Sequence, residues 1–279
     1  MKTREPAVAG TFYPGTQERL NELISKIDSS ERIKFDRTLK DIKIIGGVVP
    51  HAGYVYSGYE AVHFFNQLSV HTQPIDTVII LNPNHRGFGP SCAADIHDTW
   101  KTPVGEFAVD TDMAKKLNLP ENELAHRFEH SAEVMLPLLK YYLHEEVKIL
   151  PISIMRQAPD LAIALAHSIW ETVKKSGKKI LIIASSDFCH FVSPDVGFSL
   201  DVEVIYAILK LDVDAVYRTI KAKNISVCGY GPIMTLMEYA VISCDNVKVK
   251  VLARGNSAKS REMDQVVDYV TILFYTDSK

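Results

Sequence analysis

The chain has 279 residues, of which 47% are hydrophobic and 23% charged, a composition typical of a globular protein that can bury a sizeable core. Its formal net charge of -3 leaves no basic surplus to neutralise a phosphate backbone, so we expect no nucleic-acid partner. No apolar signal segment opens the sequence and no apolar run reaches the roughly 20 residues of a membrane span, which predicts a cytoplasmic protein without a membrane partner.

Short apolar runs, most of them rich in Val and Ile, alternate along the chain with segments of helical periodicity. In chain order, the runs predict strands at 44–50, 77–81, 147–152, 180–184, 247–252 and 266–274. The periodic segments predict helices at 58–68, 160–175, 200–209, 212–222 and 231–243. Strands that are apolar on both faces are typical of a sheet with helices on both sides. Because no repeat or linker interrupts the pattern, we predict a single α/β domain over residues 1–279, with a central, mostly parallel or mixed sheet flanked by helices.

One long segment, 84–105, shows no clear periodicity. It carries His85 and His97 together with several glycines and prolines. Long irregular segments of compact domains tend to be functional, so we expect this one to contribute to a site.

Polar side chains follow three of the predicted strands directly. His51 follows the first strand, His85 follows the second, and Asp187 and His190 follow the strand at 180–184. In open α/β sheets, ligands bind outside the carboxyl ends of the strands. Two neutral imidazoles from adjacent strand ends can share one cation, each oriented by a neighbouring carboxylate or carbonyl. Each residue alone is equally well explained as a turn, capping or surface residue, so the prediction depends on their convergence.

The four cysteines form no C-x-x-C pair, and in a reducing cytosol we expect free thiols or metal ligands instead of disulfides. Cys228 lies just before the predicted helix at 231–243. A cysteine near a helix N-terminus tends toward the thiolate that a nucleophile or a metal ligand needs. The alternative is a small buried apolar residue, which is the interpretation we give to Cys92 and Cys244.

A further polar cluster runs from Glu129 to Glu133. Ser131 is a candidate N-cap of a following helix, with Glu133 in its first turn. The functional alternative makes His130 and Glu133 acid–base groups that line the pocket. Pro137 limits how far a helix that starts at Ser131 can run without a bend.

Taken in order, the motifs of the sequence resemble those of the Memo family, whose fold is like that of the class III extradiol non-haem iron dioxygenases. The matching motifs are Arg4-Glu5-Pro6, Ala9-Gly10-Thr11-Phe12-Tyr13-Pro14, Pro50-His51-Ala52-Gly53-Tyr54, Asn82-Pro83-Asn84-His85, Thr102-Pro103-Val104-Gly105, Glu129-His130-Ser131-Ala132-Glu133, Ser185-Ser186-Asp187-Phe188-Cys189-His190 and Cys228-Gly229. Each motif is weak alone, but their shared order over residues 4 to 233 is specific.

The resemblance implies a pocket that contains His51, His85, Asp187, His190 and Cys228. In the ring-cleaving dioxygenases, two histidines and a glutamate hold Fe(II). In Memo-type proteins a cysteine, here Cys228, takes the position of that carboxylate. Because a thiolate is softer than a carboxylate, this change favours copper(I), zinc or thiolate-ligated iron, and ring cleavage cannot be carried over from the fold.

The first hypothesis is therefore a metal-dependent redox protein that binds iron or copper, with zinc as a further candidate. Its ligands are His51, His85 and Cys228. Its acid–base or supporting groups are Asp187, His190, His130 and Glu133. Whether the protein turns over a substrate is left open, and the substrate is not identified.

Three alternatives remain beside the metal hypothesis. A non-catalytic module would bind a peptide or an anionic ligand in the same pocket, with Arg86 as a donor. A zinc hydrolase would use Glu133 or Asp187 as its base. A hydrogen-bonded polar network with no ligand would be purely structural. The loop 84–87 has the form common in microbial members, which implies a functional association with a radical-SAM protein, whereas the residues after Cys228 lack the basic pair of animal members.

Overall fold

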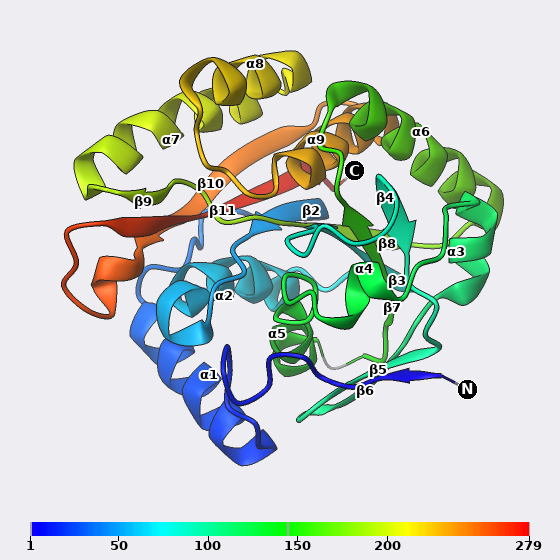
Figure 1. Cartoon of the computed structure of the whole chain (residues 1–279), viewed down its shortest axis with the longest axis horizontal. Coiled ribbons are helices and arrows are strands. Elements are labelled where there is room, and N and C mark those ends of the chain that lie inside the picture. Colours follow the sequence, from blue (N-terminus) through cyan, green and yellow to red (C-terminus); the bar gives the residue numbers. More distant parts are fainter. Residues whose placement is uncertain (1, 144, 279) are drawn as a thin grey trace.

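The computed structural model of the chain describes residues 2–143 and 145–278, so positions 1, 144 and 279 of the predicted domain lie outside the described residues. Within these residues, a mixed sheet runs through the middle of the molecule in the order β10-β11-β2-β8-β3-β7-β4, and β9 pairs with β11 (Figure 1). Its strands are β2 (Ile42–Val49), β3 (Thr77–Pro83), β4 (Cys92–Ala94), β7 (Lys148–Ile154), β8 (Ile180–Ser185), β9 (His190–Val192), β10 (Lys248–Asn256) and β11 (Val266–Asp277).

The centre of the sheet is parallel and its margins are antiparallel. β2, β8, β3 and β7 run in one direction. β11 and β4 pair with this block in the opposite sense, and β10 pairs antiparallel with β11. A small second sheet joins β1 (Thr3–Arg4), β5 (Thr99–Thr102) and β6 (Gly105–Ala108). The predicted mixed sheet is therefore confirmed.

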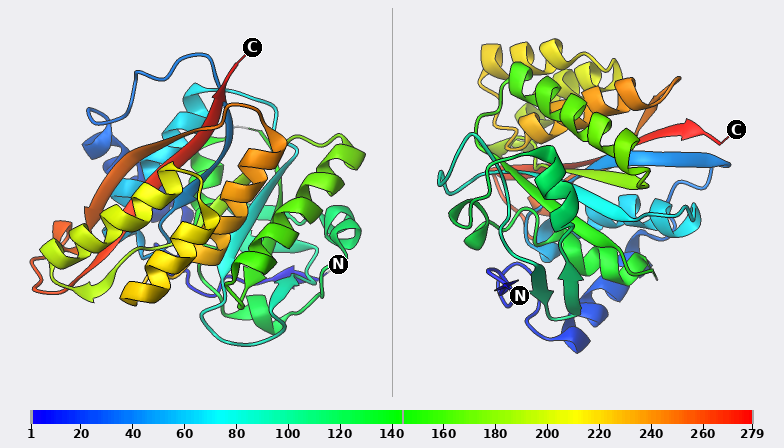
Figure 2. Two further views of the ribbon diagram at one scale, coloured as in Figure 1. Left: turned by 90° about the horizontal axis from the view of Figure 1, so that it is seen from above. Right: turned by 90° about the vertical axis from the view of Figure 1, so that its right-hand side faces the viewer.

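Helices cover both faces of the sheet, as the edge-on view in Figure 2 shows. One face carries α1 (Gln17–Glu31), α2 (Tyr54–Val70) and α5 (Met135–Tyr142). The other carries α6 (Pro159–Ser176), α7 (Pro194–Leu209), α8 (Val213–Lys223) and α9 (Tyr230–Ser243). The remaining helices of the described residues are short: α3 (Thr111–Leu117), α4 (Leu124–Arg127) and η1 (Ser257–Lys259).

The apolar strands explain this three-layer arrangement. Successive side chains of a strand point to opposite faces, so Val78 packs in the core beneath α2 while Ile79 packs in the core beneath α6 and α9. Leu181 and Ile182 divide in the same way on β8. Each fully buried aliphatic side chain stabilises the fold by about 1.5–3 kcal/mol. A face of the sheet that stayed exposed to water would lose this contribution, so helices cover both faces.

The six strands and five helices predicted from the sequence are all present, with ends that differ by a few residues. α6 shows why its ends were predictable: Pro159 begins the helix and Gly177 ends it in the left-handed conformation, with φ of 67°. The irregular segment 84–105 contains the short strands β4 and β5, which had no pattern of their own. Ser131 does not cap a helix, because α5 begins only at Met135 and the Ser131 hydroxyl donates to Glu129.

Two adjacent strands send the chain to opposite faces of the sheet. β2 leads into α2 on one face, whereas β8 leads through β9 into α7, α8 and α9 on the other. Such a switch in direction opens a crevice at the carboxyl ends of the strands, where ligands bind in open α/β sheets. Among the described residues, none of the helices has the length and apolarity needed to cross a bilayer.

Candidate metal centre

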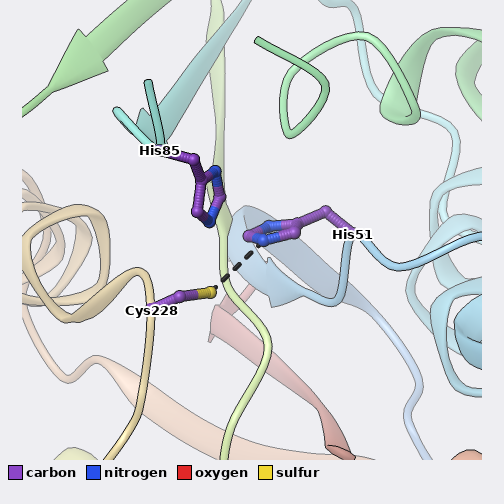
Figure 3. A group of neighbouring side chains, drawn as sticks. All are labelled: His51, His85 and Cys228. Carbon is purple, nitrogen blue, oxygen red and sulfur yellow. Dashed lines mark hydrogen bonds between the residues drawn. The ribbon is translucent and has the colours of Figure 1, made fainter. Parts of the chain in front are cut away.

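Three predicted ligands converge at this switch point. His51 follows β2, His85 follows β3, and Cys228 lies in the connection between α8 and α9. The three side chains point toward one another (Figure 3), and their potential donor atoms all lie within 4.8 Å of one another. Segments far apart in the sequence therefore bring two imidazoles and one thiol to a single point.

The hydrogen bonds of His51 fix which ring nitrogen carries the proton. Nδ1 lies 2.7 Å from Oγ of Ser185, and that hydroxyl donates its only proton to the carbonyl oxygen of Ser131 at 2.7 Å. Oγ must therefore accept from Nδ1–H, which leaves the lone pair on Nε2. Nε2 faces Sγ of Cys228 at 3.2 Å. The buried His51 ring thus presents a donor nitrogen to the thiol.

His85 is oriented in the same way, by a carboxylate. Glu129 accepts from the backbone N–H of His85 at 2.7 Å and from Nδ1 at 2.8 Å. Burial opposes the ionisation of Glu129, but its hydrogen bond to His85 and the nearby histidines hold the pKa of this carboxyl well below its usual value. An ionised acceptor requires Nδ1–H, so Nε2 of His85 is free to bind a cation.

A second group of potential ligands, formed by His85, Glu129 and His130, is less suited to a metal. Besides His85, the Glu129 carboxylate accepts from the backbone N–H groups of His130 and Ser131 and from the Ser131 hydroxyl. With the two bonds from His85, the carboxylate accepts five hydrogen bonds, four of them at Oε1. Glu129 therefore orients the site instead of binding a cation.

Cys228 is held against the end of β8. The backbone N–H of Asp187 donates to Sγ at 3.2 Å, and Gly229 allows the close approach because a Cβ there would overlap the carbonyl oxygen of Ser185. Burial, and then the charge of Asp187, raise the pKa of the Cys228 thiol well above its usual value. The N-terminus of α9, which was expected to favour the Cys228 thiolate, does not outweigh burial and the charge of Asp187. A bound cation would reverse the balance, because coordination deprotonates a thiol.

The predicted acid–base histidines lie beside this cluster. His130 stacks on His85 with ring centroids 4.8 Å apart, and its ring meets that of His51 edge-on at 5.3 Å. Burial and the neighbouring His51 lower the pKa of His130 to about 3, so this ring is neutral. His190, half-buried, directs Nδ1 to the carbonyl oxygen of Ser226 at 2.6 Å and so leaves Nε2 with its lone pair.

Asp187 contacts both the backbone and the ring of His51. Its carboxylate accepts from the backbone N–H of His51 at 2.7 Å and lies 4.0 Å from Nε2 of that ring. Burial raises the pKa of Asp187 above its usual value. It is thus a carboxyl group that can retain a proton next to the candidate ligands.

Glu133 does not join the cluster. Its carboxylate accepts from Arg4 at 2.7 Å, from the Tyr13 hydroxyl at 2.6 Å and from the backbone N–H groups of Ala7 and Val8. All of these partners belong to the N-terminal segment, and Glu133 itself is fully buried. The structure therefore places Glu133 in a closed network that anchors this segment, apart from His130 and the pocket.

Sequence reasoning assigned no role to two residues that orient the ligands. Glu129 and Ser185 both lay in the motifs, but neither was singled out. Glu129 was detectable in principle, because a carboxylate beside the motif histidine is a frequent partner of a metal-binding imidazole. Ser185 had no such signal, since serine at a strand end is common.

The donor atoms fit a bound cation. Metal–nitrogen bonds of about 2.0 Å and metal–sulfur bonds of about 2.3 Å, set at a tetrahedral angle, separate two donors by roughly 3.5 Å. Sγ of Cys228 and Nε2 of His51 are 3.2 Å apart, and the three donor atoms lie within 4.8 Å. Small side-chain adjustments would therefore bring all three into bonding distance.

Comparison with known proteins adds independent findings. The profile of a family described as Memo-like protein matches residues 4–273. A MEMO1 family protein of Methanosarcina barkeri is 38% identical over 274 residues, which cover 97% of this chain and 99% of that protein. A MEMO1 family protein of Desulfurococcus amylolyticus is also 38% identical, over 99% of this chain and 100% of its own length.

Among solved structures, the crystal structure of an uncharacterized protein of Escherichia coli K12 is similar in fold. Its TM-score is 0.56 and its sequence identity 11%, with 83% of this chain and 99% of that chain covered. At this identity the match supports the α/β fold alone.

Proposed function

The chain belongs to the Memo-like protein family, and from this premise we propose that it is a metal-binding protein whose cation is held by His51, His85 and Cys228. One observation carries the proposal. Nδ1 of His51 and Nδ1 of His85 are both engaged by acceptors, so both Nε2 lone pairs are presented beside the Cys228 thiol. In the metal-free protein the Cys228 thiol, whose pKa is raised, donates to Nε2 of His51 at 3.2 Å, and a cation would take the place of that proton.

We further propose that the cation is redox-active iron or copper. A donor set of one thiolate and two imidazoles suits copper(I), thiolate-bound iron and zinc better than it suits magnesium or calcium. Bound there with three protein ligands, an iron or copper ion would supply electron transfer and an open position for a further ligand.

The remaining residues of the site hold and move protons. Asp187, whose pKa is raised by burial, is the carboxyl group that accepts from the backbone N–H of His51 beside the candidate ligands. His190, half-buried beside the cluster, presents an Nε2 lone pair that could accept a proton from a ligand. His130 fills the space between His51, His85 and Phe12 as a neutral ring.

The test is a reconstitution of metal-free protein without oxygen. Fe(II), Cu(I) and Zn(II) are offered one at a time, and the bound metal is measured after desalting. We expect about one equivalent in the wild type and a large loss in the His51→Ala and Cys228→Ser variants. Cys244→Ser is the matched control, because Cys244 lies at the far end of α9.

Two results bear on the metal type. Oxidation and re-reduction of the iron- or copper-loaded protein, with the metal retained, would support the redox assignment. Binding of zinc alone would refute that assignment while it preserved the site. Unchanged metal content in His51→Ala would refute the ligand assignment itself.

A second candidate function is supported by the surface next to the site. Phe88, Leu124 and Phe128 are each about half exposed, and Arg86 donates from Nε to the carbonyl oxygen of Phe128 at 3.1 Å. Exposed aromatic and arginine side chains together are typical of protein-binding surfaces. A binding module that uses this surface would retain an acidic peptide in the presence of a chelator and lose it in Arg86→Gln. Binding that required the metal would contradict it.

A further inference from the structure

The segment that carries Cys228 has no regular structure of its own. It connects α8 to α9, and it is attached on one side to the loop after β8. The backbone N–H of Cys228 donates to the carbonyl oxygen of Asp187 at 3.3 Å, and the N–H of Gly229 donates to the Ser186 hydroxyl at 2.9 Å. These bonds fix one side of the loop but leave its carbonyl groups facing the other way.

Gln157, from the loop between β7 and α6, holds that other side. Its Nε2 donates to the carbonyl oxygen of Cys228 at 2.7 Å, and its Oε1 accepts from the backbone N–H of Gly231 at 2.7 Å. One amide side chain therefore satisfies a donor and an acceptor on either side of Gly229. A residue 71 positions away in the sequence thus clamps the loop of the candidate ligand.

The clamp compensates for a cap that α9 cannot supply. The first N–H groups of a helix need acceptors, and usually a Ser, Thr, Asp or Asn at the N-cap provides one. The N-cap of α9 is Gly229, and a larger residue there would overlap Ser185 and Ser186 at the end of β8. Gly231 is constrained less tightly, because a Cβ there would lie 3.0 Å from the Gln157 side chain. Close packing at Gly229 is therefore compatible with a capped helix only if another element provides the acceptor.

We propose that Gln157 is a positioning residue of the metal site, an inference that rests on the function proposed above. By joining the carbonyl of Cys228 to the first turn of α9, it holds Sγ against Nε2 of His51. All four parallel strands then contribute at their carboxyl ends: His51 after β2, Asp187 after β8, His85 after β3 and Gln157 after β7.

Two substitutions separate the two bonds of the clamp. Gln157→Glu keeps an acceptor for the N–H of Gly231 but sets a carboxylate oxygen against the carbonyl oxygen of Cys228. Gln157→Leu has a similar volume and removes both bonds. Asp212→Ala is the matched control for loss of a helix cap. Asp212 caps the N-terminus of α8 by accepting from the backbone N–H of Ala215, whereas the Cys228 loop follows the C-terminus of that helix.

The experiment measures cobalt(II) binding and thiol reactivity in the full-length chain carrying Cys244→Ser. We expect Gln157→Leu and Gln157→Glu to bind cobalt about 10–100-fold more weakly, with a weaker sulfur-to-cobalt charge-transfer absorption. In the metal-free protein, both variants should alkylate faster at Cys228. Asp212→Ala should lower the melting temperature but leave the cobalt affinity and its absorption unchanged.

The outcomes separate this inference from the proposed function. Wild-type cobalt affinity and absorption in both Gln157 variants would overturn the positioning role and leave the metal site standing. A wild-type protein that bound none of cobalt(II), Fe(II), Cu(I) and Zn(II) would overturn the metal site, and the alkylation rates would then decide on Gln157. Rates equal to that of the parent protein would overturn its role as well. Gln157→Glu keeps the cap, so the test survives if Gln157→Leu does not fold.

Discussion

Two buried polar clusters lie close together in this protein and differ in one respect. In the network of Arg4 and Glu133, donors meet acceptors: Arg4 donates to Glu133 and to two backbone carbonyl groups, and Glu133 accepts four hydrogen bonds. In the cluster of His51, His85 and Cys228, the Nε2 lone pairs face the thiol and each other. The first cluster is closed, and the second is the one that we propose to hold a cation.

The two clusters are connected through one short segment. Glu129 and Glu133 stand four residues apart, yet Glu129 orients His85 and Glu133 binds Arg4. Burial is nearly complete for both carboxylates, so burial does not distinguish their roles. What distinguishes them is the side chain that each carboxylate binds: His85 keeps a lone pair on Nε2, whereas Arg4 has none. Substitution of either carboxylate therefore tests the comparison.

The largest effect on stability is expected at Glu133. Glu133→Gln removes the charge that compensates the buried Arg4, and the loss of one partner of a buried ion pair costs about 3–5 kcal/mol. Urea denaturation at neutral pH measures the decrease in the free energy of unfolding. The metal content of the folded variant should equal that of the wild type. A decrease below about 1 kcal/mol would show that the network is not closed as described.

Glu129→Gln is the matched substitution in the open cluster. The neutral amide no longer fixes Nδ1–H of His85 and sets its own N–H groups against backbone donors. We expect metal affinity to fall about 10–100-fold, the usual cost of losing a carboxylate partner of a metal-binding histidine. Competition with a chromophoric chelator measures this. Equal effects of Glu129→Gln and Glu133→Gln on metal affinity would remove the distinction between the two clusters.

A smaller effect is expected at Ser185. Ser185→Ala removes the hydroxyl that fixes the tautomer of His51 and leaves the carbonyl oxygen of Ser131 without that donor. We expect metal affinity to fall about 10-fold and stability to fall by about 1 kcal/mol. The same chelator competition and urea series provide both values. An unchanged affinity would show that the tautomer of His51 is fixed by other contacts.

The smallest effect concerns a third buried polar pair, Asp201 and Asp268. Burial, and then the charge of Asp201, raise the pKa of Asp268 to about 7, and burial raises the pKa of Asp201 above its usual value. Arg254 and Cys189 face the same pair. The folded state therefore binds more protons than the unfolded state between about pH 4 and pH 7, so stability falls as pH rises through this window.

Asp268→Asn cannot ionise and should not show this decrease. The quantity to compare is the free energy of unfolding of the variant minus that of the wild type. This difference should rise by on the order of 1 kcal/mol between about pH 4 and about pH 8. Urea denaturation at the two pH values gives the difference. A wild type and variant with parallel pH profiles would contradict the raised pKa of Asp268.

The fold was predictable from the sequence because its determinants are local. Apolar runs such as 180–184 and the Pro159-to-Gly177 helix carry their period and their end signals within the segment. α1 was also locally encoded, since Leu20, Ile24 and Ile27 form a buried stripe, but this pattern was overlooked. β4 has three residues and exists because it pairs with β7, which no local pattern reveals.

The site was predictable only in part. His51 and His85 follow strands, so the topology brings them together. Cys228 was singled out by its place before a predicted helix, and the family resemblance added its position in the pocket. The roles of Ser185 and Gln157 depend on contacts with residues distant in sequence, the Ser131 carbonyl and the Cys228 loop. The partners of Glu133 were equally invisible, because Arg4 lies 129 positions away.

The most direct test of the central claim is elemental analysis of freshly purified protein, prepared without oxygen and without a metal-affinity column, beside the Cys228→Ser variant. We predict close to one equivalent of iron or copper in the wild type and its loss in the variant. A metal-free wild type that also fails to take up Fe(II), Cu(I) and Zn(II) would contradict the account, since the open lone pairs of His51 and His85 would then serve no cation.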